Sequence, residues 1–148
     1  MLGRDLTSLF RRKVNEACLA MEDKPVRELP SKVTFGEAPS SGYRAGCSFR
    51  GRDMLIKEGL PPEQIEIVLK REAFICLLPK QVDSVPQVYD LAWAYATEDE
   101  KWWSKGTTKV YDPSCPVYDA PSLFRKFRGE MRIEGGRWRS LNPSRRRT

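Results

Sequence analysis

The sequence predicts a small, mainly α protein with short β elements, an α+β fold in which a helical body carries extended proline-rich connectors, a C-terminal β-hairpin and a basic tail. Three observations predict this class: a helical stripe of apolar residues near the start, frequent proline and glycine between short segments, and a Gly-Gly turn near the end. The 148 residues suffice for one modest domain. We expect an amphipathic helix in residues 1–24, an extended connector in 25–46, a helical body in 47–106, and an extended segment, hairpin and basic tail in 107–148.

The first helix is predicted by apolar residues that recur every three or four positions and so share one helix face. These residues are Leu6, Leu9, Phe10, Val14, Ala17, Cys18 and Met21. The helix should begin near Asp5 or Thr7 and end before Pro25, whose ring cannot continue the hydrogen-bond ladder. Its N-terminal half also carries basic residues that are typical of an organelle-targeting segment. These are Arg4, Arg11, Arg12 and Lys13. Asp5 and Glu16, however, depart from the acid-poor composition of such segments and favour an ordinary surface helix.

The connector contains Pro25, Pro30 and Pro39, with one short β-like patch at residues 32–35. A loop of this length is unusual inside a compact domain unless it is functional or lies against a partner. We therefore expect an extended arm that contacts a neighbouring subunit.

The helical body is predicted to start with a helical hairpin. Residues 52–58 can form a short helix closed by Gly59, and a second helix should run from Glu63 to Leu78 after a Pro-Pro start. A strand is the alternative for the second segment, because Ile65, Ile67 and Leu69 alternate as they would in a strand. The hairpin also fits a DNA-binding helix-turn-helix, but its second helix offers a groove only Gln64, Lys70 and Arg71.

A third helix is predicted after Ser84, which forms a capping-box pattern with Gln87, and Gly106 supplies its stop. Trp93, Trp102 and Trp103 cannot all face one side of a single helix, so at least one indole should point outward. Tryptophan is enriched at interface hot spots. The predicted protein-docking residues are Trp93, Trp102, Trp103 and Trp138.

The C-terminal hairpin is predicted at residues 132–139, where two alternating runs flank Gly135-Gly136. A two-residue turn would place Ile133 opposite Trp138 on an apolar face, with three arginines and one glutamate on the other. Such a hairpin is only marginally stable alone, so its apolar face should dock on this domain or on a partner.

The net charge of +6 is concentrated at the C-terminal end. Residues 121–148 contain nine basic and two acidic residues, whereas residues 1–120 contain 17 basic and 18 acidic ones. Arginines suit phosphate contacts, and Phe124, Phe127 and Trp138 lie between them as stacking residues could. The alternative is a solubilising or disordered tail whose arginines form salt bridges with acidic residues of the same chain. The predicted contacts to RNA or another polyanion are Arg125, Lys126, Arg128, Arg132, Arg137, Arg139, Arg145, Arg146 and Arg147.

The residue inventory argues against most catalytic classes and predicts no cofactor and no metal. Histidine is absent, and with it the commonest general base and metal ligand. The four cysteines are too widely spaced for a zinc knuckle, and no glycine-rich phosphate loop is present. No apolar run is long enough to span a bilayer. One remnant of enzymatic chemistry is Cys47, whose pKa neighbouring arginines could lower.

We therefore expect a non-catalytic accessory subunit of a large intracellular assembly. The basic amphipathic start favours a mitochondrial setting, a ribosome or a respiratory-chain complex. Its partners would be other protein subunits, with RNA or an acidic protein surface on the basic tail. The alternatives are a stand-alone nucleic-acid-binding module and a viral connector or head-closure protein.

Overall fold

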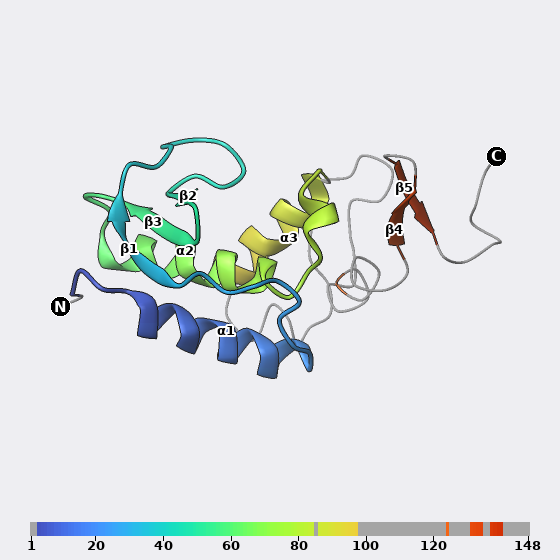
Figure 1. The fold of residues 1–148 in the computed structure, drawn as a ribbon, viewed down its shortest axis with the longest axis horizontal. Helices are drawn as coiled ribbons and strands as arrows, with labels where there is room; N and C mark the ends of the chain where they lie inside the picture. The colour runs from blue at the N-terminus through green and yellow to red at the C-terminus, as the bar shows by residue number, and fades with distance from the viewer. Residues whose placement is uncertain (1–2, 85, 98–123, 125–130, 135–136, 141–148) are drawn as a thin grey trace.

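The computed structural model describes residues 3–84, 86–97 and 124, together with the strands 131–134 and 137–140 (Figure 1). It is a small α+β structure, as the sequence predicts. The described elements are, in order, α1 (Thr7–Met21), β1 (Lys32–Gly36), β2 (Cys47–Arg50), β3 (Asp53–Lys57), α2 (Pro62–Ile75), the 3₁₀ turn η1 (Lys80–Ser84), α3 (Pro86–Thr97), β4 (Met131–Glu134) and β5 (Arg137–Ser140).

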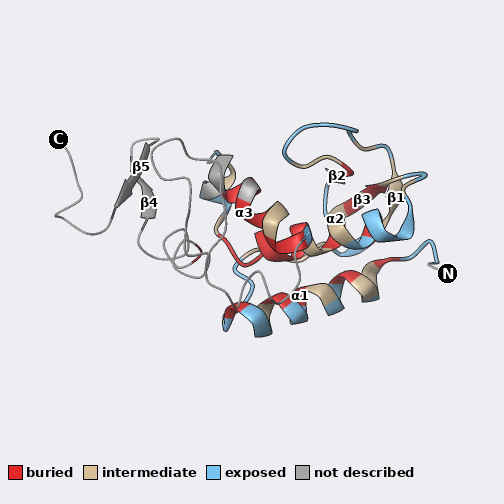
Figure 2. Cartoon of the chain, turned by 180° about the vertical axis from the view of Figure 1, so that it is seen from behind, coloured by how far each residue is buried: buried red, intermediate tan, exposed pale blue. Residues whose placement is uncertain are grey.

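Helix α1 confirms the predicted stripe, since Phe10, Val14, Ala17 and Met21 are buried along one face (Figure 2). The helix ends at its C-cap residue Glu22, which adopts a left-handed conformation with φ of 54°. The Glu22 backbone N–H donates to the Cys18 carbonyl. This C-cap satisfies a carbonyl of the last turn.

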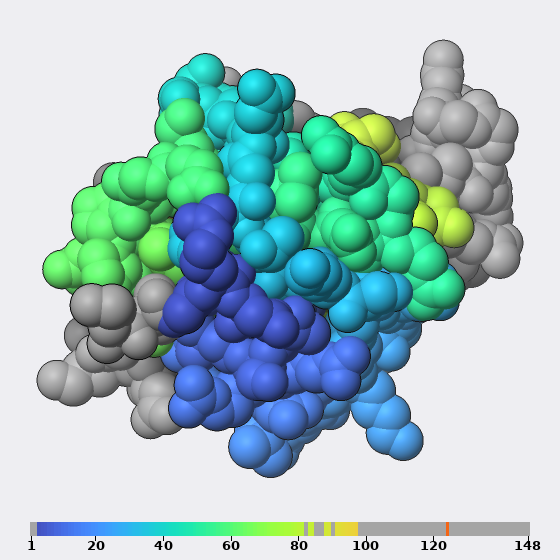
Figure 3. Space-filling view, turned by 60° about the vertical axis from the view of Figure 1, so that its left-hand side comes forward, coloured from blue at the N-terminus to red at the C-terminus, as the bar shows by residue number. Residues whose placement is uncertain are grey.

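The residues before α1 join the helix to the sheet. The Leu6 N–H donates to the Val33 carbonyl at 2.8 Å, and the Val33 N–H donates to the Thr7 hydroxyl at 3.0 Å. Figure 3 shows the N-terminal residues lying against this part of the molecule. The outer edge of β1 is therefore partly covered by the chain's own N-terminal segment.

A three-stranded sheet of order β1-β3-β2 overturns one predicted helix. The predicted helix at 52–58 is wrong: Met54 and Ile56 are buried on one face of β3, in the two-residue period of a strand. Gly51, with φ of 61°, lies in the two-residue turn of the β2–β3 hairpin, where glycine is favoured. The predicted β-like patch at 32–35 is confirmed as β1. Strand β1 lies in the predicted connector (25–46) and β3 in the predicted helical body (47–106), so their parallel pairing joins these two segments in one sheet.

Helix α2 settles the helix-or-strand alternative in favour of a helix. Pro61 is the N-cap residue of α2, and Pro62 is its first helical residue. Glu63 lies in the first turn, where its negative charge interacts favourably with the positive end of the helix dipole. The helix ends at Ile75, three residues before the predicted Leu78. Arg71 and Glu72 are 0% and 1% exposed, so Arg71 is not available for the nucleic-acid contact considered above.

The core consists of two apolar clusters that α1 and α2 span together. One lies between the helices and the sheet face that carries Val33, Cys47, Met54 and Ile56. The other lies between α1, the C-terminal half of α2 and α3, and it also contains Phe124. In this second cluster the Phe74 ring packs against Tyr95 at 5.0 Å and edge-on against Phe124 at 5.5 Å.

Strands β4 and β5 pair antiparallel with Ile133 opposite Trp138, Arg132 opposite Arg139, and Glu134 opposite Arg137. The division of the hairpin into an apolar and a basic face stays a prediction, because it concerns side chains outside the described part of the structure. Residues 98–123 also lie outside it, and with them the predicted continuation of the third helix to Gly106. Within the described residues, no helix combines the length and apolar character needed to cross a membrane.

Candidate functional site: a charged pocket beside a buried arginine–glutamate cluster

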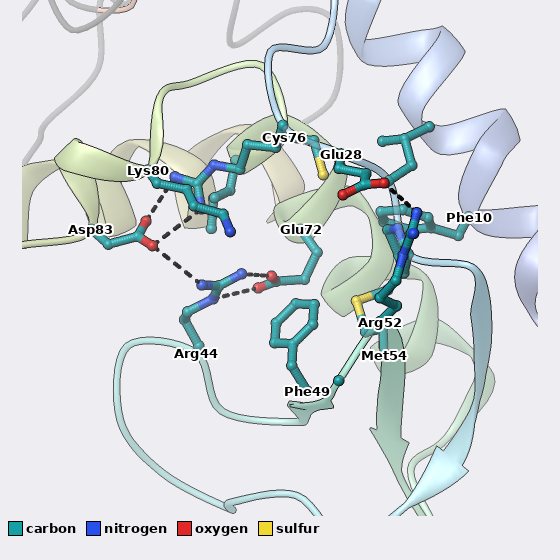
Figure 4. Close-up of a pocket in the computed structure, with 15 residues that line it drawn as sticks. Phe10, Glu28, Arg44, Phe49, Arg52, Met54, Glu72, Cys76, Lys80 and Asp83 are labelled. Atoms are coloured by element: carbon teal, nitrogen blue, oxygen red, sulfur yellow. Dashed lines mark hydrogen bonds and ion pairs between the residues drawn. The ribbon is translucent and has the colours of Figure 1, made fainter.

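A cavity of about 370 Å³ opens between α1, the β2–β3 hairpin, α2 and the segments at 27–30 and 80–83 (Figure 4). Its base is apolar, formed by the buried side chains of Phe10, Met54 and Ile75. Its other walls carry charged groups. These are Arg27, Glu28, Arg44, Arg52, Glu72, Lys80 and Asp83.

The carboxylate of Glu72 is shared by two arginines. Arg71 Nε donates to Glu72 Oε2 at 2.9 Å. Arg44 pairs with the same carboxylate through Nε and Nη2, as Figure 4 shows. Burial alone would lower the pKa of Arg44, but the charge and hydrogen bonds of Glu72 outweigh it and raise that pKa. The Arg44 guanidinium is therefore charged.

Arg71 uses its remaining donors inside the protein. Its Nη1 donates to the Ala45 carbonyl at 2.7 Å and its Nη2 to Cys47 Sγ at 3.3 Å. The guanidinium also lies 4.8 Å from the centre of the Trp93 ring, a cation–π distance. These contacts join α2 to the 42–47 loop and to α3.

Arg27 closes the opposite side of the pocket. It donates to Asp83 Oδ1 at 2.7 Å and Oδ2 at 3.1 Å, and to the carbonyls of Leu78 and Pro79. Arg44 Nη1 lies 3.9 Å from the same Asp83 carboxylate. This network fixes the segment after α2 against the connector.

Within the described residues, each pocket carboxylate has a guanidinium partner, while Lys80 makes no ion pair. Three guanidinium groups, those of Arg27, Arg44 and Arg71, face the two carboxylates of Glu72 and Asp83. Glu28 pairs separately with Arg52. The inner cluster thus keeps one positive charge, and Lys80 adds a second at the rim.

Aromatic rings pack around the 42–47 loop, and one of them, Phe49, lines the pocket. The Tyr43 ring stacks on Tyr89 at 5.3 Å, and the Arg44 guanidinium lies 5.0 Å from the centre of the Phe49 ring. The Trp93 indole N–H donates to the Tyr43 carbonyl at 3.0 Å. Trp93 is half-buried and holds the loop against α3, while its predicted role in docking a partner stays a prediction.

Cys47 is not an activated thiol. It is buried, and burial, together with the charge of Glu72, raises its pKa to about 12 despite the opposing effect of Arg71 and Arg44. The expectation that neighbouring arginines leave Cys47 with a lowered pKa is wrong, because the effect of burial outweighs theirs.

We expect Cys47 in the folded chain to react with iodoacetamide at pH 8 at least about a hundredfold more slowly than a free thiol, since thiolate is the nucleophile. Quantitative mass spectrometry of the Cys47 peptide over time measures this rate. Labelling in urea is the control, because unfolding returns the thiol to an ordinary pKa. A folded-state rate equal to that of a model thiol would contradict the assignment.

Few of the residues predicted to contact a protein partner or a polyanion lie within the described part of the structure. Of the four tryptophans, only the Trp93 side chain is described, and the side chains of the predicted polyanion contacts from Arg125 to Arg147 all lie outside the described residues. Phe124 is described and is 2% exposed in the helical core, so it is not a stacking residue for a nucleic acid, as considered above.

Cys47 and Cys76 are buried cysteines that form no disulfide within the described part of the chain. Among the described residues, no group of three or more cysteines and carboxylates could hold a metal ion. The pocket itself was not predicted. The adjacent Arg71 and Glu72 lie between the apolar pairs Val68-Leu69 and Ala73-Phe74, and they were its one sequence signal, because charges placed among core residues must pair internally.

The chain matches no family model, no curated protein and no solved structure.

Proposed function

We propose that the chain is a non-catalytic structural subunit of a large assembly, mitochondrial in setting. Residues 3–97 would form the body that docks on neighbouring proteins, and residues 121–148 a basic arm for RNA or an acidic protein surface. The segregation of charge carries this proposal, because the excess positive charge lies in the last 28 residues.

The ion pairs among residues 3–97 support placing the polyanion contacts on the basic arm and not on the body. Of the eight arginines among residues 3–97, five form ion pairs with carboxylates of the same chain: Arg4, Arg27, Arg44, Arg52 and Arg71. A polyanion would have to compete with these internal carboxylates. The basic arm is therefore the favoured place for polyanion contact.

Exposed apolar side chains supply candidate docking points on the body. Leu19, on the outer side of α1, is 80% exposed, and Val26, just beyond that helix, is 51% exposed. Exposed apolar surface of this kind is removed from water when a partner binds.

The buried stripe makes α1 part of the core, which argues against its removal as a targeting segment after import.

Sedimentation of a native-source extract tests the proposal. We expect the chain to migrate with a large particle, and the Leu19→Ser/Val26→Ser double variant to shift toward the free 17.0 kDa species. Ala20→Ser, an exposed change on the same helix, is the matched control and should stay with the particle. A wild-type chain that migrates alone would contradict the proposal.

The basic arm is tested separately with the purified chain and single-stranded RNA. Each phosphate contact contributes roughly 0.7 to the magnitude of the slope of log affinity against log salt. Replacing Arg145, Arg146 and Arg147 by glutamine removes three such contacts, so it should reduce that magnitude by about 2. Tight RNA binding by a chain that migrates alone in the extract would favour the stand-alone nucleic-acid-binding module. Ring formation by the purified chain would favour the viral connector.

A further inference from the structure

We propose that the pocket between α1, the β2–β3 hairpin and α2 binds a small organic anion with a compact apolar body, whose charged group pairs with Lys80 at the rim. This inference goes beyond a structural role, and it rests on the arrangement of apolar and charged groups within one cavity (Figure 4).

The apolar body of the ligand would occupy the base. Phe10, Met54 and Ile75 line that base, and Leu29 and Phe49 continue the apolar surface toward the opening. A volume of about 370 Å³ lies within the range of small-molecule sites, which combine apolar walls with a few oriented polar groups. The buried Glu72 carboxylate also lines the cavity, but it is already paired with Arg44 and Arg71, so the deep part of the cavity offers a ligand apolar surface and not an unpaired charge.

The charge of the rim selects an anion over a cation. Glu72 is already shared by Arg44 and Arg71, and Asp83 lies between Arg27 and Arg44. A cation would have to displace a guanidinium from one of these pairs. An anion instead meets Lys80, which is exposed and makes no ion pair within the described part of the chain.

The geometry of the cluster gives the anion a fixed environment. Arg44 is held by Glu72 and packs over Phe49, and Arg27 is held by Asp83 and by two backbone carbonyls. Their positive ends are thus positioned before a ligand arrives, which limits the entropic cost of binding. Among the described cations that line the cavity, Lys80 makes no ion pair, so it can reorient toward the ligand.

Two dyes that share the same aromatic rings test the proposal on the full chain. The probes are 8-anilino-1-naphthalenesulfonate, an anion, and N-phenyl-1-naphthylamine, which lacks the sulfonate. We expect saturable 1:1 binding of the anionic dye, measured by fluorescence titration, and clearly weaker binding of the neutral dye. Equal affinity for the two dyes would overturn the proposal, because the site would then select only for apolar surface.

Variants place the dye in the pocket. Lys80→Gln should weaken the anionic dye about fivefold, the loss expected for one exposed ion pair, and leave the neutral dye unchanged. Phe49→Ala should weaken both dyes because it removes apolar wall. Lys32→Gln is the matched control, since Lys32 is exposed on β1 and does not line the cavity, and it should have no effect.

The basic tail is the competing site for an anionic dye, so the Arg145, Arg146 and Arg147 to glutamine variant is titrated in parallel. Unchanged affinity in this variant, together with the loss in Lys80→Gln, supports the pocket. Loss of binding in the tail variant, or unchanged affinity in Lys80→Gln with its circular dichroism preserved, would overturn the proposal.

Discussion

Replacing Glu72 by methionine is expected to destabilise the folded protein by about 3–5 kcal/mol, because it leaves a buried guanidinium without its counter-charge. Arg71 is fully buried and its pairing carboxylate is that of Glu72, so it cannot turn toward water. This cost is a large part of the 5–15 kcal/mol that stabilises an ordinary domain. Urea unfolding followed by far-ultraviolet circular dichroism at pH 7 measures it.

Removing the unpaired guanidinium of Arg71 as well should restore most of the lost free energy of unfolding. In an Arg71→Met/Glu72→Met double variant, the buried pair is replaced by apolar side chains, a change that is often neutral or stabilising. Arg44 is partly exposed and retains Asp83 at 3.9 Å. We expect the double variant to lie within about 1–2 kcal/mol of the wild type, because hydrogen bonds to Ala45 and Cys47 are also lost.

Glu66→Met is the matched control on the same helix. Glu66 is half-exposed and pairs with Lys13 at 3.4 Å, so its loss should cost less than about 1 kcal/mol. If Glu72→Met cost no more than Glu66→Met, the buried cluster would not stabilise the fold. A Glu72→Met variant that fails to fold, with a folded double variant, would agree with the expected result.

The helices were accessible from sequence because each carries a local signal. The spacing of Phe10, Val14 and Ala17 defines α1 without reference to the rest of the chain, and two prolines followed by Glu63 mark the start of α2. Each signal is contained in a few consecutive residues and reports the helix that those residues form.

Strands β2 and β3 of the sheet were missed because the signal of the sheet is divided between distant segments. Met54 and Ile56 alternate over only five residues, which is too short to separate a strand from a helical turn. The parallel partner of β3 is β1, about twenty residues earlier, and no local pattern reports that pairing. Gly51 in a two-residue turn between alternating residues was the one signal for the β2–β3 hairpin.

The pocket was missed for a related reason. Arg27, Arg44, Glu72 and Asp83 come from four separate segments, and only the tertiary fold brings them together. The sequence composition correctly located the excess charge at the C-terminal end. It did not indicate that several arginines of the body are paired internally, because pairing depends on contacts between residues far apart in the chain.

Phe124→Ala is expected to destabilise the protein by about 3–5 kcal/mol, although Phe124 lies within the C-terminal segment of excess positive charge. Its ring is buried in the helical cluster and packs edge-on against Phe74, which in turn contacts Tyr95. Truncation to alanine would leave a cavity lined by these rings. Thermal unfolding should show a lowered Tm, whereas Phe49→Ala, at a half-exposed aromatic residue, should change Tm little.

Two truncations separate this packing role from the basic arm. A chain that ends at residue 128 keeps Phe124 and removes the hairpin and the terminal arginines, so its Tm should match that of the full chain. A chain that ends at residue 120 loses Phe124 and should melt at a lower temperature, as Phe124→Ala does. Equal Tm values for the two truncated chains would contradict the anchoring role of Phe124, because the segment 121–128 would then contribute nothing to the core.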